Sequence, residues 1–122
     1  MYYDSFLSYH LMKKINLAVT GCMGRMGQQI IKSVNKDKNF KLVALTESKK
    51  IKKKIGNISI SLNNQQVLKK ANLIIDFTIP KCTLEILKIA LKLKKRVVIG
   101  TTGFNKKEEN LIKKFSHREY IC

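Results

Sequence analysis

The chain has 122 residues, of which 44% are hydrophobic, and this length and composition are typical of one globular domain rather than two. Lys and Arg number 25 against 8 Asp and Glu, so the formal net charge is +17 and a nucleic-acid partner has to be considered. No apolar run approaches the roughly 18 residues that cross a bilayer, so we predict no membrane partner.

The distribution of the basic residues argues against nucleic-acid binding. Lysines recur in every segment, and arginine, the better reader of bases, occurs only at Arg25, Arg96 and Arg118. Aromatic residues are not interleaved with the lysine runs, as stacking on bases would require. A basic nucleic-acid binder therefore stays an alternative, and we expect the charge to attract an anionic cofactor instead.

Neither the ends of the chain nor its cysteines indicate a catalytic or metal-binding site. Residues 1–12 are predicted to form a disordered N-terminal extension, without the positive charge of a secretory signal, and residues 13–122 to form the domain. The cysteines at positions 22, 82 and 122 have neither metal-type nor redox-type spacing, which predicts a reduced, cytoplasmic protein without a metal.

A glycine-rich loop follows the first predicted strand. Residues 20–27 read T-G-C-M-G-R-M-G and join a strand at residues 15–19 to a helix at residues 28–34. In dinucleotide-binding folds such a loop lets the backbone approach a pyrophosphate at the positive end of the helix. The spacing G-x-x-G-x-x-G only approximates the usual fingerprint, so a tight turn without a ligand remains an alternative.

An acidic residue ends the second predicted strand, residues 40–47. Glu47 lies 47 − 21 = 26 residues past the first glycine, where about 20 is usual for the carboxylate that binds the adenosine ribose. The alternative is an ordinary solvated glutamate at a strand end. Loop and acid together favour nucleotide binding.

The middle of the chain alternates between linker and regular structure. Residues 48–57 are predicted to be a basic linker that closes in a Gly-Asn turn, and residues 58–62 a short edge strand. Asn63 or Asn64 can cap a brief helix that holds Val67, Leu68 and Ala71.

The remaining elements continue the alternation of strands and helices. Residues 73–78 read as a buried parallel strand, and Pro80 suits the first turn of a helix over residues 81–93. A strand at residues 96–99 precedes a final helix, which Asn105 and Glu108 cap and which turns Leu111, Ile112 and Phe115 inward.

The order of elements predicts an α/β fold of the Rossmann type, an open, mostly parallel sheet with helices on both faces. Three polar or glycine-rich stretches, residues 21–27, 76–78 and 100–103, lie at the carboxyl ends of predicted strands. Because ligands bind at the carboxyl ends of such strands, we expect these stretches to meet in one site.

These three stretches resemble the N-terminal signatures of 4-hydroxy-tetrahydrodipicolinate reductase, also called dihydrodipicolinate reductase. The resemblance spans about residues 13–115 and rests on G-R-M-G, D-F-T and G-T-T-G in this order. It implies the dinucleotide-binding domain of an enzyme that uses NADPH or NADH to reduce the dipicolinate precursor, on the route to diaminopimelate and lysine.

The resemblance also implies a set of cofactor-binding residues. Six loop residues would wrap the pyrophosphate, Glu47 would hold the adenosine ribose, and five residues would contact the nicotinamide half. The loop residues are Gly21, Cys22, Met23, Gly24, Arg25 and Met26, and the nicotinamide residues are Phe77, Thr78, Gly100, Thr101 and Thr102.

Two departures from the family pattern shape the expectations. The arginine that often follows the ribose acid is replaced by Ser48, with Lys49 and Lys50 next, so the preference for NADH or NADPH stays open. The family's H-H-x-x-K-x-D-x-P-S-G-T motif, which binds substrate and supplies the proton donor, is not among these 122 residues.

We therefore expect a truncated domain that lacks its final strands, has no catalytic residue of its own and is inactive alone. Binding of 4-hydroxy-tetrahydrodipicolinate and homo-oligomer formation would belong to the full-length enzyme. A stand-alone nucleotide-binding module without catalysis is the alternative.

Overall fold

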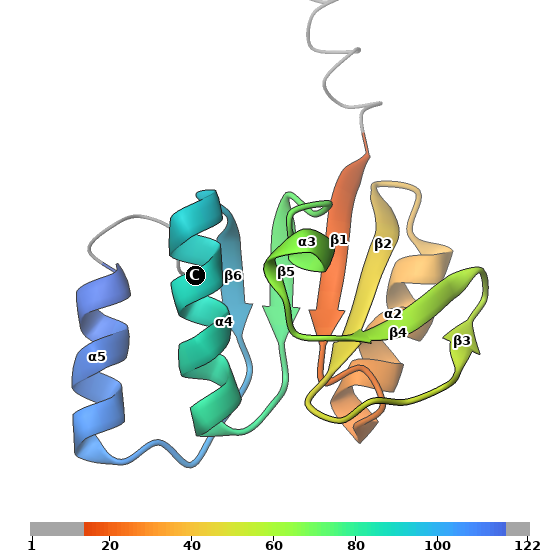
Figure 1. Ribbon diagram of the computed structural model, residues 1–122. Coiled ribbons are helices and arrows are strands. Elements are labelled where there is room, and N and C mark those ends of the chain that lie inside the picture. The colour runs from red at the N-terminus through yellow and green to blue at the C-terminus, as the bar shows by residue number, and fades with distance from the viewer. Residues whose placement is uncertain (1–13, 117–122) are drawn as a thin grey trace, which may run out of the picture.

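The computed structural model describes residues 14–116 (Figure 1). The predicted extension at residues 1–12 and the cysteine at position 122 lie outside the described residues.

The described residues form one six-stranded sheet with helices on both sides (Figure 1). The strand order is β3-β4-β2-β1-β5-β6, and every pairing is parallel except that of β3 with β4. This confirms the predicted open α/β fold. The strands are β1 (Ile15–Thr20), β2 (Phe40–Glu47), β3 (Lys54–Ile55), β4 (Ile58–Leu62), β5 (Leu73–Asp76) and β6 (Arg96–Ile99). The helices are α2 (Arg25–Lys36), α3 (Gln65–Leu68), α4 (Pro80–Leu93) and α5 (Lys106–Ser116).

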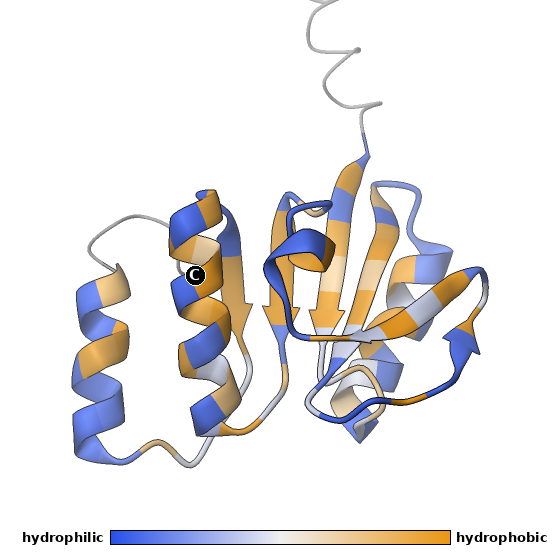
Figure 2. Ribbon diagram, viewed as in Figure 1, coloured by the Kyte–Doolittle hydropathy of each residue, from blue (hydrophilic) through white to orange (hydrophobic). Residues whose placement is uncertain are grey.

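Hydrophobic side chains on both faces of the sheet form two core clusters. In β1, Ala18 belongs to the cluster beneath α3 and α4, whereas Leu17 and Val19 belong to the cluster beneath α2. Successive strand residues point to opposite faces, so a central strand covered on both sides must be apolar throughout. Figure 2 shows this as hydrophobic colour along the central strands and mixed colour on the helices.

The first helix begins three residues before its predicted start at Gln28. Gly24 is the N-cap, with extended backbone angles, and α2 starts at Arg25. The side chain of Met26 is 52% exposed, so the first turn lacks the apolar spacing by which a buried helix is recognised. The loop thus passes directly into the helix.

The predicted edge strand at Ile58–Leu62 is β4, but it does not lie at the edge. It pairs with β2 on one side, and the two-residue strand β3, inside the predicted linker, covers the other. Gly56 makes the turn between β3 and β4 with φ +60°, as the Gly-Asn signal predicts. Two residues are too few to show an alternating pattern.

Capping side chains fix the ends of two helices. Asn64, not Asn63, caps α3, and its Oδ1 accepts a hydrogen bond from the Val67 N–H at 2.9 Å. Asn105 and Glu108 exchange side-chain-to-backbone hydrogen bonds of 2.9 and 2.8 Å at the start of α5, which confirms the predicted capping box.

The inward face of α5 differs in one residue from the prediction. Ile112 and Phe115 pack against the core cluster beneath α4, but Leu111 is 37% exposed. Of the two neighbouring apolar positions 111 and 112, only one can face the core, because successive helix residues point about 100° apart.

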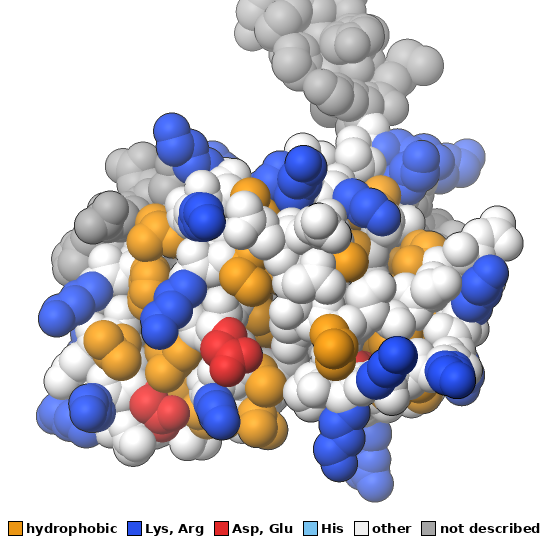
Figure 3. Space-filling view, viewed as in Figure 1, with side chains coloured by type: hydrophobic (Ala, Val, Ile, Leu, Met, Phe, Trp, Pro, Cys, Tyr) orange, Lys and Arg blue, Asp and Glu red, His pale blue; other side chains and the backbone are white. Residues whose placement is uncertain are grey.

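Lys and Arg side chains are spread over the visible face rather than gathered in one patch (Figure 3). This distribution matches the one expected from the sequence. Among residues 14–116, no helix has the length and apolar character needed to span a membrane.

Candidate functional site

The three predicted stretches meet at the carboxyl ends of β1, β5 and β6. They line a cavity of about 250 Å³, whose walls are Gly24, Arg25, Met26, Gly27, Phe77, Thr78, Gly100, Thr101 and Thr102. In the strand order, β1 lies between β2 and β5, so the chain adds its next strands first on one side of β1 and then on the other, and the strand order reverses beside β1. Ligands of open parallel sheets bind at this point.

Two glycines of the loop are required by the fold itself. Gly21 has φ +71°, and a Cβ there would lie 2.1 Å from the carbonyl oxygen of Phe77. At Gly27, on the first turn of α2, a Cβ would lie 2.4 Å from the Gly21 carbonyl oxygen. Larger side chains at either position would push the loop off the sheet.

Gly24 is different, because nothing in the described chain demands a glycine there. Its φ is −70°, and a Cβ would meet its nearest neighbour, the Gly21 carbonyl oxygen, at an ordinary 3.4 Å. The residue is exposed and lines the cavity. Close approach of a ligand to the backbone would account for it.

Most backbone N–H groups of the loop are already paired. Gly21 and Cys22 donate to the Thr46 carbonyl at 3.0 and 3.3 Å, and Gly24 donates to the Gly21 carbonyl at 3.1 Å. The N–H groups of Arg25, Met26 and Gly27 form the first turn of α2, whose cap makes no side-chain hydrogen bond. These three are the donors that an anion in the cavity can use.

Glu47 supports the loop directly. It ends β2, and its Oε2 accepts a hydrogen bond of 2.7 Å from the Met23 N–H. Because the bond joins residues 24 positions apart, no local sequence pattern predicts it. Ser48, Lys49 and Lys50 follow as exposed residues.

Cys22 is a packing residue inside the loop. Its side chain is fully buried in the core cluster beneath α2. Burial, and secondarily the negative charge of Glu47, raise the pKa of the Cys22 thiol from 9.0 to about 11. The thiol is therefore protonated and poorly nucleophilic at neutral pH.

The raised pKa of Cys22 makes stability depend on alkaline pH. Because the pKa is higher in the folded state, the stabilisation is complete below about pH 9 and is lost as the pH rises through about 11. We expect the urea midpoint to fall between pH 8.5 and pH 11 more steeply in the natural chain than in Cys22→Ala. Because both proteins contain the same lysines, the difference between their pH dependences reports Cys22. Equal slopes of the urea midpoint against pH would contradict the expectation.

The loop after β6 packs against Phe77. A Cβ on Gly100 would lie 2.0 Å from the Phe77 ring, so only glycine leaves the ring in place beside the cavity. The Thr101 hydroxyl oxygen accepts a hydrogen bond of 2.8 Å from the Thr78 N–H and so joins this loop to the one after β5. Thr102 is exposed at the rim.

A buried carboxylate beneath the cavity was not among the predicted binding residues. Asp76, the last residue of β5, is 0% exposed. In the described part of the chain, the side-chain carboxylate accepts hydrogen bonds from four threonine hydroxyls, those of Thr20, Thr78, Thr83 and Thr101. The D-F-T motif marks its position, but the sequence does not indicate which residues surround it.

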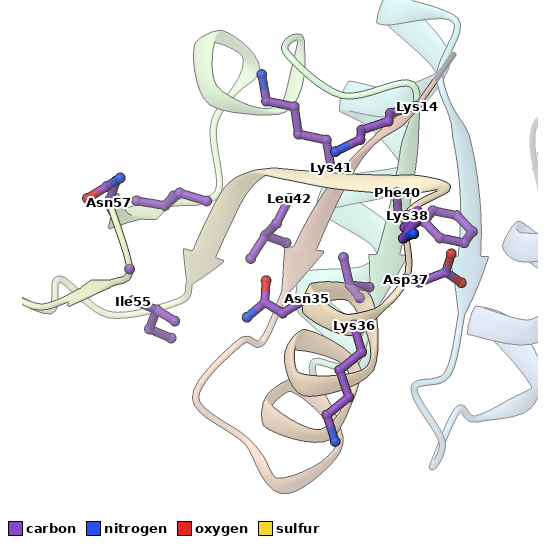
Figure 4. Close-up of a pocket in the computed structure, with 13 residues that line it drawn as sticks. Lys14, Asn35, Lys36, Asp37, Lys38, Phe40, Lys41, Leu42, Ile55 and Asn57 are labelled. Atoms are coloured by element: carbon purple, nitrogen blue, oxygen red, sulfur yellow. The ribbon is translucent and has the colours of Figure 1, made fainter. Parts of the chain in front are cut away.

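A larger cavity, of about 560 Å³, lies at the opposite end of the sheet (Figure 4). It is formed by the end of α2, the start of β2 and the turn between β3 and β4. Figure 4 shows Lys14 and Lys41 on one side of it and Lys36 directed away. None of the residues predicted to bind the cofactor lines it, so the smaller cavity remains the candidate site.

The fold is shared with known enzymes. The structure matches a dipicolinate-bound dihydrodipicolinate reductase from Paenisporosarcina sp. TG-14 with a TM-score of 0.68 and 26% identity, over 84% of this chain and 43% of that one. It matches S. aureus homoserine dehydrogenase with a TM-score of 0.71 and 17% identity, over 91% and 32% of the two chains. The second likeness concerns the fold alone.

The sequence comparisons are more specific. The chain is 70% identical over 105 residues to the 4-hydroxy-tetrahydrodipicolinate reductase of Pelagibacter ubique (strain HTCC1062), over 86% of this chain and 41% of that protein. It is 38% identical over 117 residues to the enzyme of that name from Buchnera aphidicola subsp. Acyrthosiphon pisum (strain 5A), over 87% and 44%. The chain thus spans less than half the length of these curated relatives. Residues 15–122 match the family described as "Dihydrodipicolinate reductase, N-terminus", and the chain belongs to this family.

Proposed function

We propose that this chain is the NAD(P)H-binding domain, residues 13–122, of a cytoplasmic 4-hydroxy-tetrahydrodipicolinate reductase in diaminopimelate and lysine biosynthesis. One observation supports the proposal above the others. The three family stretches meet around one cavity at the switch point of the sheet, with the first-turn N–H groups of α2 on its wall and a glycine that nothing in residues 14–116 requires. Reduction of the dipicolinate precursor and homo-oligomer formation are proposed for the full-length enzyme.

In this proposal each part of the cofactor has its own contacts. The pyrophosphate lies over Gly24 and accepts hydrogen bonds from the first turn of α2. The adenosine ribose binds the Glu47 oxygen that does not accept from Met23. The nicotinamide occupies the cavity beside Phe77 and the two threonines, Thr78 and Thr101. The cofactor supplies the hydride, and these residues bind and orient it.

The 2′-phosphate of NADPH would lie near the residues that follow Glu47. Lys49 and Lys50 are exposed there and can neutralise a phosphate, but they lack the planar fork of arginine. We therefore propose that both NADH and NADPH bind.

Fluorescence titration with the reduced cofactors tests binding, and the absence of Trp keeps the protein background low. We expect saturable binding of both. Raising the salt from 0.05 to about 0.5 M should weaken NADPH more than NADH, because screening acts on the extra exposed phosphate contacts. No saturable binding by folded protein would contradict the proposed function, and equal salt effects would contradict the role of the lysines.

The 122-residue polypeptide should not turn over the substrate by itself. Positioning of donor and acceptor contributes about 7–11 kcal/mol to such reactions, and the family's substrate motif is not in this sequence. We expect no oxidation of NADPH on addition of the dipicolinate precursor, measured by absorbance against a full-length reductase as positive control. Steady, substrate-dependent oxidation would contradict this expectation.

A further inference from the structure

The geometry points to Asp76 as a positioning residue that makes the nicotinamide cavity select a hydrogen-bond donor. We propose that its buried carboxylate turns the Thr78 and Thr101 hydroxyls into acceptors, so that the site prefers a carboxamide to a carboxylate. The inference rests on the proposed function, because it concerns the nicotinamide half of the same site.

The hydrogen bonds around Asp76 fix the direction of each hydroxyl. Oδ1 accepts from Thr20 at 2.6 Å and from Thr78 at 2.8 Å. Oδ2 accepts from Thr83 at 2.5 Å and from Thr101 at 3.0 Å. An ionised carboxylate can only accept, and each hydroxyl has a single hydrogen, so all four hydrogens point toward Asp76.

The remaining contacts agree with this direction. The Thr78 hydroxyl also lies 3.2 Å from that of Thr83 and 3.3 Å from the Ile79 carbonyl, both farther than its 2.8 Å bond to Asp76. The Thr101 hydroxyl oxygen uses one lone pair for the Thr78 N–H at 2.8 Å. Its hydrogen is committed to Asp76, so what it can still offer is a lone pair.

Thr78 and Thr101 line the cavity, whereas Thr20, Thr83 and Asp76 do not. The carboxylate is therefore one hydrogen bond away from a bound ligand and acts through the two threonines. It leaves lone pairs toward the cavity and adds a negative charge beneath it. An amide N–H₂ group can donate to such lone pairs, whereas a carboxylate cannot and is repelled.

Calorimetric titration of the natural chain with NADH and deamido-NADH tests the proposal, because the two ligands differ only in the amide or acid group of the ring. We expect NADH to bind at least about tenfold more tightly, because the two ligands differ by one charge-assisted hydrogen bond. ADP-ribose, which lacks the ring, serves as the reference. Equal affinities for the two dinucleotides would overturn the proposal and leave the proposed function standing. Failure of all three ligands to bind would overturn both.

Asp76→Asn isolates the role of the carboxylate. The Asn amide must donate to one pair of hydroxyls, so either Thr78 or Thr101 is released to donate into the cavity. We expect the preference for NADH to shrink to about threefold or less, with unchanged ADP-ribose affinity. An unchanged preference would overturn the proposal.

Thr20→Val is the matched control. It removes one hydrogen bond from the same carboxylate but leaves both cavity hydroxyls donating to Asp76. It should lower stability and keep the natural preference. If Asp76→Asn does not fold, Thr101→Val replaces it: loss of that acceptor should also reduce the preference for NADH, and retention of the full preference would overturn the proposal.

Discussion

Gly24→Ala is expected to leave the domain folded and to weaken NADH binding by tenfold or more. The new methyl group meets the Gly21 carbonyl oxygen at 3.4 Å, an ordinary contact, and φ of −70° suits alanine. Alanine in place of glycine at a helix N-cap costs about 0.5–1 kcal/mol. The same methyl group would point into the space where the pyrophosphate approaches the backbone, which is what reduces affinity.

Gly21→Ala is the opposite case and serves as the comparison. A methyl group 2.1 Å from the Phe77 carbonyl, at φ +71°, should destabilise the fold by about 3 kcal/mol or more. Thermal melts and NADH titrations of both variants separate the two roles. If Gly24→Ala binds NADH like the natural chain, the ligand does not approach at this position.

Glu47→Ala should weaken NADH binding by roughly 1.5–3 kcal/mol, because a charge-assisted hydrogen bond to the ribose is lost. The structure adds a second effect, since the Met23 N–H loses its acceptor and the loop loses a support. NADPH should lose less than NADH, because its 2′-phosphate gains from removal of the nearby carboxylate.

Glu47→Gln separates the two effects of Glu47. The Gln amide oxygen can still accept from Met23, so the loop and the melting temperature should be close to those of the natural chain. NADH should then lose less affinity than in Glu47→Ala. Unchanged NADH affinity in Glu47→Ala would contradict the assignment of this residue to the ribose.

Features set by neighbouring residues were predictable from the sequence. β2 and β6 have the predicted bounds, because runs of β-branched and apolar residues identify buried strands. The Asn105–Glu108 capping box was also predictable, because both partners lie within one helical turn. The meeting of the three stretches followed from a topological rule for parallel sheets.

Features made by distant residues were not predictable. Two of the four threonines around Asp76 are distant in sequence, since the bond from Thr20 spans 56 positions and the bond from Thr101 spans 25. The bond from Met23 to Glu47 depends on the parallel pairing of β1 with β2. Together with the backbone hydrogen bonds of Gly21, Cys22 and Gly24, the Met23 bond leaves the first turn of α2 as the source of N–H donors for a ligand. That turn includes Gly27, which was not among the predicted binding residues.

Mapping NADH onto the chain by amide chemical shifts in NMR tests the site assignment most directly. We expect NADH to shift the amides of the first turn of α2 and of residues 77–78 and 100–102, while those around the larger cavity at Lys38 and Asn57 stay unchanged. Shifts confined to the larger cavity, or no shifts at saturating NADH, would contradict it.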